Sequence, residues 1–244
     1  NPGDEVIIPT PCWVSYVEIV KLAEAVPVLV KTANNFQLDI AAIEKSITPK
    51  TKAVIINTPN NPTGAVYTKE SLDALGRLAV KHDFYIISDE VYEKLVYDGR
   101  KHICIASLSD EIKAHSIIVN GFSKAYAMTG WRIGYIAAPE WIVKGCNKLQ
   151  GQYTSGPCSV SQKAAEAAYT LEQGCVEDMR KAFERRRDLI VELAKDIPGL
   201  EVNVPEGAFY LFPKCSSFFG KSNGEKTINS STDFALYLLE KAHV

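Results

Sequence analysis

The chain has 244 residues, of which 46% are hydrophobic and 23% are charged, so it can bury a sizeable core in one or two domains. Its 27 basic and 29 acidic residues give a net charge of −2, which excludes a strong electrostatic attraction to nucleic acid or to an anionic membrane. No apolar run is long enough to cross a bilayer.

Short apolar runs alternate with helical patterns along most of the chain. We predict strands at 6–8, 26–31, 53–57, 84–88, 116–120 and 132–137. We predict helices at 14–24, 39–47, 68–82, 139–150, 158–171, 176–197 and 232–242, the third with Thr68 as its N-cap. Strands separated by helices indicate an α/β fold, with a largely parallel sheet that helices cover on both faces.

The pattern changes after Gly199. We predict short strands at 201–204 and 208–212, then a polar loop and the last helix. A domain boundary is placed in the long helix near residue 186, so that residues 1–185 form a large domain and 186–244 begin a smaller α/β domain. The run Arg185-Arg186-Arg187 is expected to be a solvated helix face rather than an anion site.

The two ends of the sequence indicate an internal piece of a longer chain. The first residues predict a turn just before a strand, and the last helix ends without a capping signal. A targeting segment could therefore precede Asn1.

Cysteine and histidine spacing gives no sign of a metal site. The six cysteines include no Cys-X-X-Cys pair, which favours reduced thiols in a cytoplasmic protein over a disulfide framework. The four histidines show neither metal-ligand spacing nor an obvious triad, and we interpret them as surface or structural residues. No P-loop and no G-x-G-x-x-G motif occurs.

Three polar clusters follow predicted strands, where doubly wound sheets bind their ligands. The first is Asn57–Gly64, NTPNNPTG, whose two X-Pro steps and glycine restrict the backbone and can hold the amide of Asn61 in one orientation. As an isolated segment, an ordinary Pro/Gly turn explains it better.

The second cluster contains Asp89 and Tyr92. An acid at the end of a buried strand is costly unless a cation pairs with it, and a protonated pyridine nitrogen is one such cation. Asp89 could equally cap the segment that follows. The third cluster contains Trp13, whose indole could stack on a flat ring, although a core tryptophan is the simpler interpretation.

The segment Val119–Tyr135 contains a lysine in unusual surroundings. Lys124 lies among small and apolar residues, with no carboxylate beside it in the sequence. Such a lysine can lose its proton at low cost, and a neutral amine condenses with a carbonyl cofactor. Arg132 lies eight residues further on and could bind an anion near that amine. A surface lysine on a loop is the alternative.

Together these segments resemble the fold-type I pyridoxal-phosphate-dependent aminotransferases of class I and II, in particular the aspartate aminotransferase branch. The matching stretches are PTPCWVSY (9–16), NTPNNPTGAVY (57–67), SDEVYE (88–93), VNGFSKAYAMTGWRIGY (119–135) and GAFYLF (207–212). Their order and spacing agree over nearly the whole chain. The resemblance implies a cofactor-binding large domain with a mostly parallel sheet, and part of a smaller C-terminal domain.

The resemblance also implies roles for individual residues. Lys124 is expected to be the Schiff-base lysine and the proton carrier, and Asp89 the partner of the pyridine nitrogen. Asn61 and Tyr92 are expected to hydrogen-bond the 3′-oxygen of pyridoxal 5′-phosphate. Of the remaining residues, Trp13 should stack on the ring and Arg132 should bind the phosphate.

Some positions depart from the family pattern. Many relatives have a hydroxyl three residues before the lysine, where this chain has Gly121, so Ser123 or a backbone amide is expected to contact the phosphate instead. Cys12 replaces a tyrosine of close relatives and is expected to pack rather than react. Tyr210 is expected to belong to the core. The family's N-terminal segment and the C-terminal arginine that binds the substrate's α-carboxylate are missing.

The expected activity is transamination between aspartate or glutamate and a 2-oxo acid, with prephenate as a further acceptor. The similarity of Phe218–Val244 to the aspartate/prephenate subgroup suggests this. Two alternatives remain: a catalytically incomplete cofactor-binding fragment or sensor module, or a lyase of the same fold. Members of the fold are usually homodimers, and we expect the same here.

Overall fold

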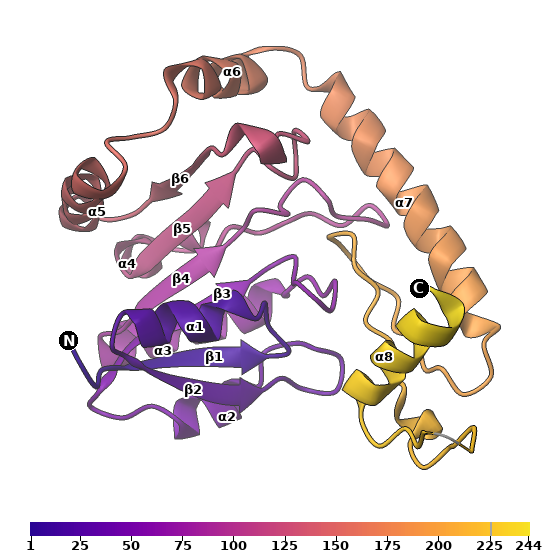
Figure 1. Ribbon diagram of the computed structural model, residues 1–244. Coiled ribbons are helices and arrows are strands. Elements are labelled where there is room, and N and C mark those ends of the chain that lie inside the picture. Colours follow the sequence, from indigo (N-terminus) through magenta and orange to yellow (C-terminus); the bar gives the residue numbers. More distant parts are fainter. Residues whose placement is uncertain (225) are drawn as a thin grey trace.

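The computed structural model describes residues 1–224 and 226–244, and within them it contains a six-stranded sheet of order β2-β1-β3-β4-β5-β6 (Figure 1). Five strands are parallel: β1 (Glu5–Thr10), β2 (Val26–Lys31), β3 (Thr51–Asn57), β4 (Tyr85–Asp89) and β5 (Ser116–Gly121). The last strand, β6 (Gly134–Ala137), pairs antiparallel with β5. The expected α/β class with a largely parallel sheet is confirmed.

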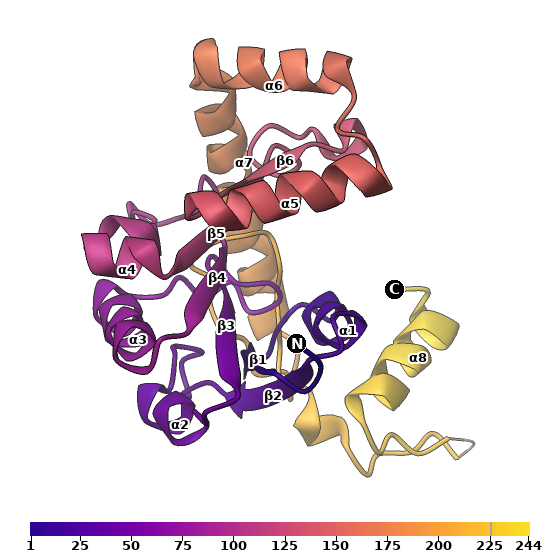
Figure 2. The same ribbon diagram turned by 90° about the vertical axis from the view of Figure 1, so that its left-hand side faces the viewer.

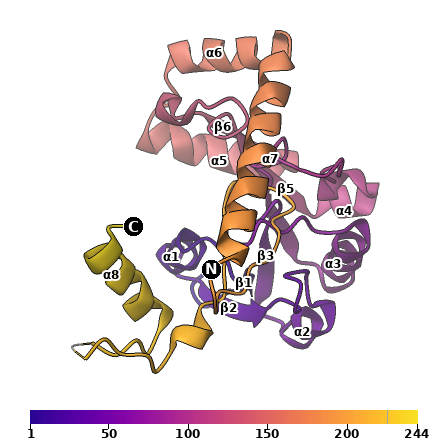
Figure 3. The same ribbon diagram turned by 90° about the vertical axis from the view of Figure 1, so that its right-hand side faces the viewer.

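Helices lie on both faces of the sheet. The described helices are α1 (Ser15–Leu22), α2 (Ile40–Lys45), α3 (Lys69–His82), α4 (Asp110–Ala114), α5 (Glu140–Tyr153), α6 (Ser159–Thr170), α7 (Gly174–Lys195) and α8 (Ser231–Ala242), of which α6 and α8 lie away from the sheet (Figures 2 and 3). In Figures 2 and 3, α2, α3 and α4 lie on one side of the sheet and α1 lies on the other. None of the described helices is long and apolar enough to span a membrane.

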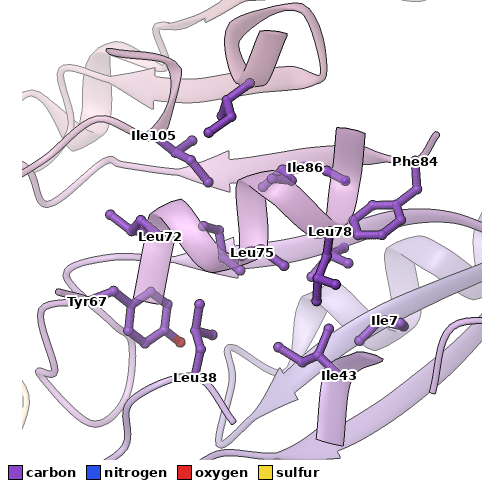
Figure 4. Packing of buried hydrophobic residues seen from close by; sticks show 14 of the residues in the cluster. Ile7, Leu38, Ile43, Tyr67, Leu72, Leu75, Leu78, Phe84, Ile86 and Ile105 are labelled. Carbon is purple, nitrogen blue, oxygen red and sulfur yellow. The ribbon is translucent and has the colours of Figure 1, made fainter. Parts of the chain in front are cut away.

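Strand alternation divides the core between these two faces. Ile7 and Ile56 point toward α2 and α3, into the largest cluster of buried side chains (Figure 4). Their neighbours Ile8 and Ile55 point the other way and pack with α1. Successive side chains of a strand face opposite sides, so each inner strand contributes to both layers. The sheet is thus fixed from both faces, and its carboxyl edge is a rigid support for a site.

Helix α3 shows how the local sequence sets an element. The side chain of Thr68 accepts a hydrogen bond from Ser71 N at 3.2 Å, which confirms the predicted N-cap. Leu72 and Leu75 are fully buried on one face of the helix. Asp83 ends the helix in the left-handed conformation, with φ 54°.

The predicted elements of residues 1–198 all form, with ends displaced by a few residues, but the predicted strands at 201–204 and 208–212 are wrong. Those segments make only isolated bridges, from Glu201 to Lys214 and from Gly207 to Val96. Ala208 has φ 58°, which interrupts an extended backbone, and its N–H donates to the carbonyl of Leu95 in a loop. The segment is held by a loop of the larger part of the chain and not by a second sheet.

The arginine run on α7 was expected to be solvated, but this expectation fails at Arg187. Arg185 and Arg186 are exposed, but the Arg187 side chain is only 6% exposed. Its guanidinium donates to both carboxylate oxygens of Asp98, at 2.7 and 3.0 Å, and to the carbonyl of Pro205 at 2.6 Å. A buried cation needs such partners, so Arg187 is a structural contact between α7 and two loops.

Candidate active site

One cavity at the carboxyl edge of the sheet brings the predicted site residues together. It has a volume of about 520 Å³ and is lined by all seven of them: Trp13, Asn61, Asp89, Tyr92, Ser123, Lys124 and Arg132. They come from the segments that follow β1, β3, β4 and β5, which are far apart in the sequence but end at the same edge (Figure 1). The cavity is large enough for a cofactor-sized molecule.

Asp89 is the last residue of β4, and both of its carboxylate oxygens are bound. Oδ2 accepts a hydrogen bond from the Tyr16 hydroxyl at 2.6 Å, and Oδ1 accepts one from Val91 N at 3.1 Å. Burial raises the pKa of Asp89, while these two hydrogen bonds act in the opposite direction. The bond to Val91 shows that Asp89 does cap the following turn, and this role coexists with its place in the cavity.

The backbone of Asp89 is also fixed. Its carbonyl oxygen accepts hydrogen bonds from Asn57 Nδ2 at 2.9 Å and from Thr58 N at 3.1 Å. Asn57 Oδ1 in turn accepts from Asn61 N at 2.6 Å. Asn57, at the end of β3, therefore connects Asp89 of β4 to the segment that carries Asn61. The sequence predicted Asn57 only as part of a turn.

Asn61 and Tyr92 meet at a third side chain, Tyr210. The Tyr210 hydroxyl lies 2.6 Å from that of Tyr92, and it accepts a hydrogen bond from Asn61 Nδ2 at 3.2 Å. Burial raises the pKa of Tyr92, so this phenol keeps its proton at neutral pH. The expectation that Tyr210 belongs only to the core is wrong: its ring packs, but its hydroxyl lies in the cavity.

Lys124 lies in the turn after β5, partly buried. Its Nζ is 5.8 Å from the ring centre of Tyr92 and 5.5 Å from that of Phe209. Lys124 and Asp89 line the same cavity. The surface-loop alternative for Lys124 does not fit this position.

The other side of the cavity offers hydrogen-bond donors suited to an anion. Arg132 adopts a left-handed conformation, with φ 51°, and one guanidinium nitrogen donates to the carbonyl of Thr129 at 2.8 Å. The Thr129 hydroxyl donates to the carbonyl of Ser123 at 3.0 Å, which closes the turn. Arg132 retains further N–H donors in a fixed fork, the geometry that matches a phosphate.

The structure gives a steric reason for Gly121. A Cβ at this position would lie 3.2 Å from the carbonyl oxygen of Ile133 and 3.3 Å from Cα of Gly134. β5 and β6 approach closely here, so a larger side chain would crowd the β6 backbone. A side chain at residue 121 would require the β6 backbone to move by a few tenths of an ångström.

Trp13 lies at the edge of the cavity and is 42% exposed, so the core-tryptophan interpretation is wrong. It packs edge-on against Tyr16, with ring centres 5.4 Å apart. Tyr16 itself was missed from the sequence, although it follows Trp13 by three residues, a spacing that places both on one side of a helical turn.

A buried carboxylate lies directly behind the site. Glu90 is 1% exposed and accepts hydrogen bonds from the Ser88 hydroxyl at 2.9 Å and from His102 Nε2 at 2.8 Å. Glu93 contributes a third atom that lies within 4.8 Å of the other two. The bond to Glu90 uses only Nε2 of His102, and its buried Nδ1 has no hydrogen-bond partner among the described residues.

Comparison with known proteins identifies relatives of the whole chain. Residues 1–244 match the family described as aminotransferase class I and II. The chain is 50% identical to an aspartate aminotransferase of Geobacillus stearothermophilus, with 100% of this chain and 62% of the relative covered. It is 46% identical to a probable aspartate/prephenate aminotransferase of Rickettsia bellii, with the same coverage.

Solved structures show the same similarity. The crystal structure of an aspartate aminotransferase from Rhizobium meliloti superposes with a TM-score of 0.96 at 44% identity, covering 100% of this chain and 62% of that one. An aromatic aminotransferase from Pyrococcus horikoshii superposes with a TM-score of 0.92 at 42% identity, covering 100% and 64%. The chain thus spans less than two thirds of the length of these relatives.

Proposed function

The chain belongs to the class I and II aminotransferase family, and we propose that its protein uses pyridoxal 5′-phosphate to transfer an amino group between an amino acid, aspartate or glutamate, and a 2-oxo acid. Prephenate is proposed as a further acceptor, because one of the similar proteins is described as a probable aspartate/prephenate aminotransferase. The observation that carries the proposal is the shared cavity of Lys124 and Asp89.

The residues of the cavity fit this cofactor. When bound, pyridoxal phosphate supplies an aldehyde that condenses with amines and a ring that withdraws electrons. Asp89 is a partly buried acid able to pair with a protonated ring nitrogen. Arg132 would hold the phosphate, with Ser123 beside it. Asn61 and Tyr92 would donate to the 3′-oxygen, and Trp13 would cover the ring.

Lys124 is proposed to have two tasks. Its Nζ would hold the cofactor through its aldehyde carbon in the resting protein. Once a substrate amine has displaced Lys124, the freed lysine amine would accept the proton from the substrate's α-carbon. It would then return that proton to a different atom of the substrate or cofactor. Tyr16 would keep Asp89 in its charged form throughout.

Two further proposals concern the whole protein. We propose a homodimer, supported by apolar side chains that α5 and α6 leave exposed. The thiols of all six cysteines are free, which supports a reducing compartment such as the cytoplasm.

A half-reaction tests the proposed activity. Full-length protein loaded with pyridoxal phosphate is mixed with aspartate alone, and the absorbance of the cofactor and the released acid are followed. We expect conversion of the aldehyde form to the amine form with release of oxaloacetate. Pyruvate and ammonia would indicate a lyase instead, and unchanged absorbance would contradict catalysis. Lys81→Ala, a change at an exposed position of α3, should behave as wild type.

A further inference from the structure

Tyr210 has no part in the proposed function so far, yet it contacts two residues that do. It follows Tyr92 by 118 positions, and its hydroxyl lies 2.6 Å from that of Tyr92. The same oxygen accepts from Asn61 Nδ2 at 3.2 Å. Both partners are the side chains proposed to hold the cofactor's 3′-oxygen.

The backbone around Tyr210 is closely fitted to the cavity wall. Ala208 N donates to the carbonyl of Leu95 at 2.9 Å. At Gly207 a Cβ would lie 2.7 Å from the Leu95 oxygen and 2.8 Å from Cβ of Pro59, so only glycine allows this approach. The rings of Tyr210 and Tyr92 also pack edge-on, with centres 5.7 Å apart. Tyr210 is therefore held at the site by packing on several sides.

Two directions are possible for the hydrogen bond between the two phenols, because either oxygen can be the donor. Each phenol has one O–H, and one hydrogen lies between the two oxygens. If Tyr92 donated that hydrogen to Tyr210, it would have none left for a ligand. If Tyr210 donates it, while accepting from Asn61, the hydrogen of Tyr92 is free to point into the cavity.

We propose that Tyr210 is a positioning residue, which accepts a hydrogen bond from Asn61 and donates to Tyr92, and so directs the Tyr92 hydrogen toward the 3′-oxygen of the cofactor. This inference rests on the proposed function. The charged groups that face Tyr92 from neighbouring elements are Asp89 and Lys124, and a change at residue 210 alters neither charge.

The test is Tyr210→Phe in the full-length protein. A hydrogen-bond donor to the 3′-oxygen stabilises negative charge on that oxygen. This charge is largest when the bound cofactor is deprotonated. Loss of the relay should raise the pH midpoint of the cofactor's absorbance change by roughly 0.5–1 pH unit and weaken cofactor binding roughly 2–10-fold. Both quantities are measured without substrate.

Tyr169→Phe is the matched control. Tyr169 makes the same phenol–phenol contact, 2.7 Å to Tyr135, but does not line the cavity. It should leave both quantities unchanged. In a Tyr92→Phe background, Tyr210→Phe should change neither the pH midpoint nor the cofactor affinity further, because the Tyr92 hydroxyl that Tyr210 orients is absent.

Three results would overturn the assignment. The first is a pH midpoint and a cofactor affinity in Tyr210→Phe that equal those of the wild-type protein. The second is an equal shift in the control variant Tyr169→Phe, which would indicate a general structural effect. The third is an undiminished shift in the Tyr92→Phe background. If wild-type protein binds no pyridoxal phosphate, the proposed function itself fails, which is distinguishable from failure of the relay alone.

Discussion

Among single residues, Asp89 has the most demanding position, because the proposed function requires this partly buried acid to be charged. Burial raises its pKa, and the Tyr16 hydroxyl, 2.6 Å away, favours the charged form. Burial and the nearby carboxylate raise the pKa of Tyr16 as well, so that its hydroxyl retains the proton it donates. Burial therefore opposes the hydrogen bonds from Tyr16 and Val91 in setting the pKa of the acid.

Removing that hydrogen bond should weaken cofactor binding. In Tyr16→Phe the pKa of Asp89 rises further, so the acid limb of the binding profile moves to higher pH. A hydrogen bond to a charged group contributes about 1.5 kcal/mol, so affinity at neutral pH should fall about tenfold. Fluorescence titration with pyridoxal phosphate across a pH series measures both effects.

Tyr126→Phe provides the comparison for this experiment, because the Tyr126 hydroxyl donates to Gln173, and neither residue lines the cavity. An unchanged affinity and pH profile in Tyr16→Phe would show that Asp89 does not need this donor.

At the scale of elements, Arg187 connects α7 to the turn at Asp98 and to the carbonyl of Pro205. Arg187→Ala should lower the free energy of unfolding by about 2–3 kcal/mol, less than for a fully buried pair, because the Asp98 side chain is 52% exposed. Denaturant unfolding measures this. Arg186→Ala, at the exposed neighbouring position, should change stability by less than about 0.5 kcal/mol.

The effect of Arg187 should depend on pH. Arg187 holds the pKa of Asp98 below its ordinary value, so the carboxylate is stabilised in the folded protein. That contribution is complete above the ordinary pKa of an aspartate and is lost as pH falls through the lowered one. Wild type and Arg187→Ala should therefore converge in acid. A constant difference at all pH values would indicate that packing, not charge, is responsible.

The sequence predicts elements where the signal is local and misses them where it is not. Thr68 and the apolar face of α3 predicted that helix, and alternating strands and helices predicted the sheet. The short helix α4 was missed because five residues carry no periodicity. The strand predicted at 208–212 failed because Ala208 bonds to the loop at Leu95, a tertiary effect, and the one predicted at 201–204 is reduced to a single bridge between Glu201 and Lys214.

The same distinction holds for the site. The strand-end positions of Asp89 and Lys124 could be predicted because parallel strands end at one edge. The contribution of Tyr210 could not, since it depends on a segment 118 residues beyond Tyr92. The burial of Arg187 could not be predicted either, because it belongs to a run of three arginines of which the other two, Arg185 and Arg186, are exposed.

At the scale of the whole molecule, α5 and α6 have little to cover them in the described part of the chain. α5 contains no buried residue there, and Trp141, Tyr153 and Leu171 are at least 64% exposed. Large apolar side chains with this much exposure are typical of interaction surfaces. We predict a homodimer that persists in high salt, because apolar contacts are not screened.

Sedimentation velocity of the full-length protein over a range of concentrations tests this prediction. A species of twice the chain mass, unchanged by added salt, is expected. A monomer at all concentrations would contradict it. Dissociation by salt would show instead that charged contacts dominate the interface.

The amine of Lys124 and the acid of Asp89 share one cavity, and we propose that this cavity binds pyridoxal phosphate covalently. Borohydride reduction of the loaded full-length protein, followed by peptide mass spectrometry, tests it most directly. We predict a single reduced cofactor on the peptide that contains Lys124, and none in Lys124→Ala. Labelling spread over other lysines, or equal labelling of the Lys124→Ala protein, would contradict the claim.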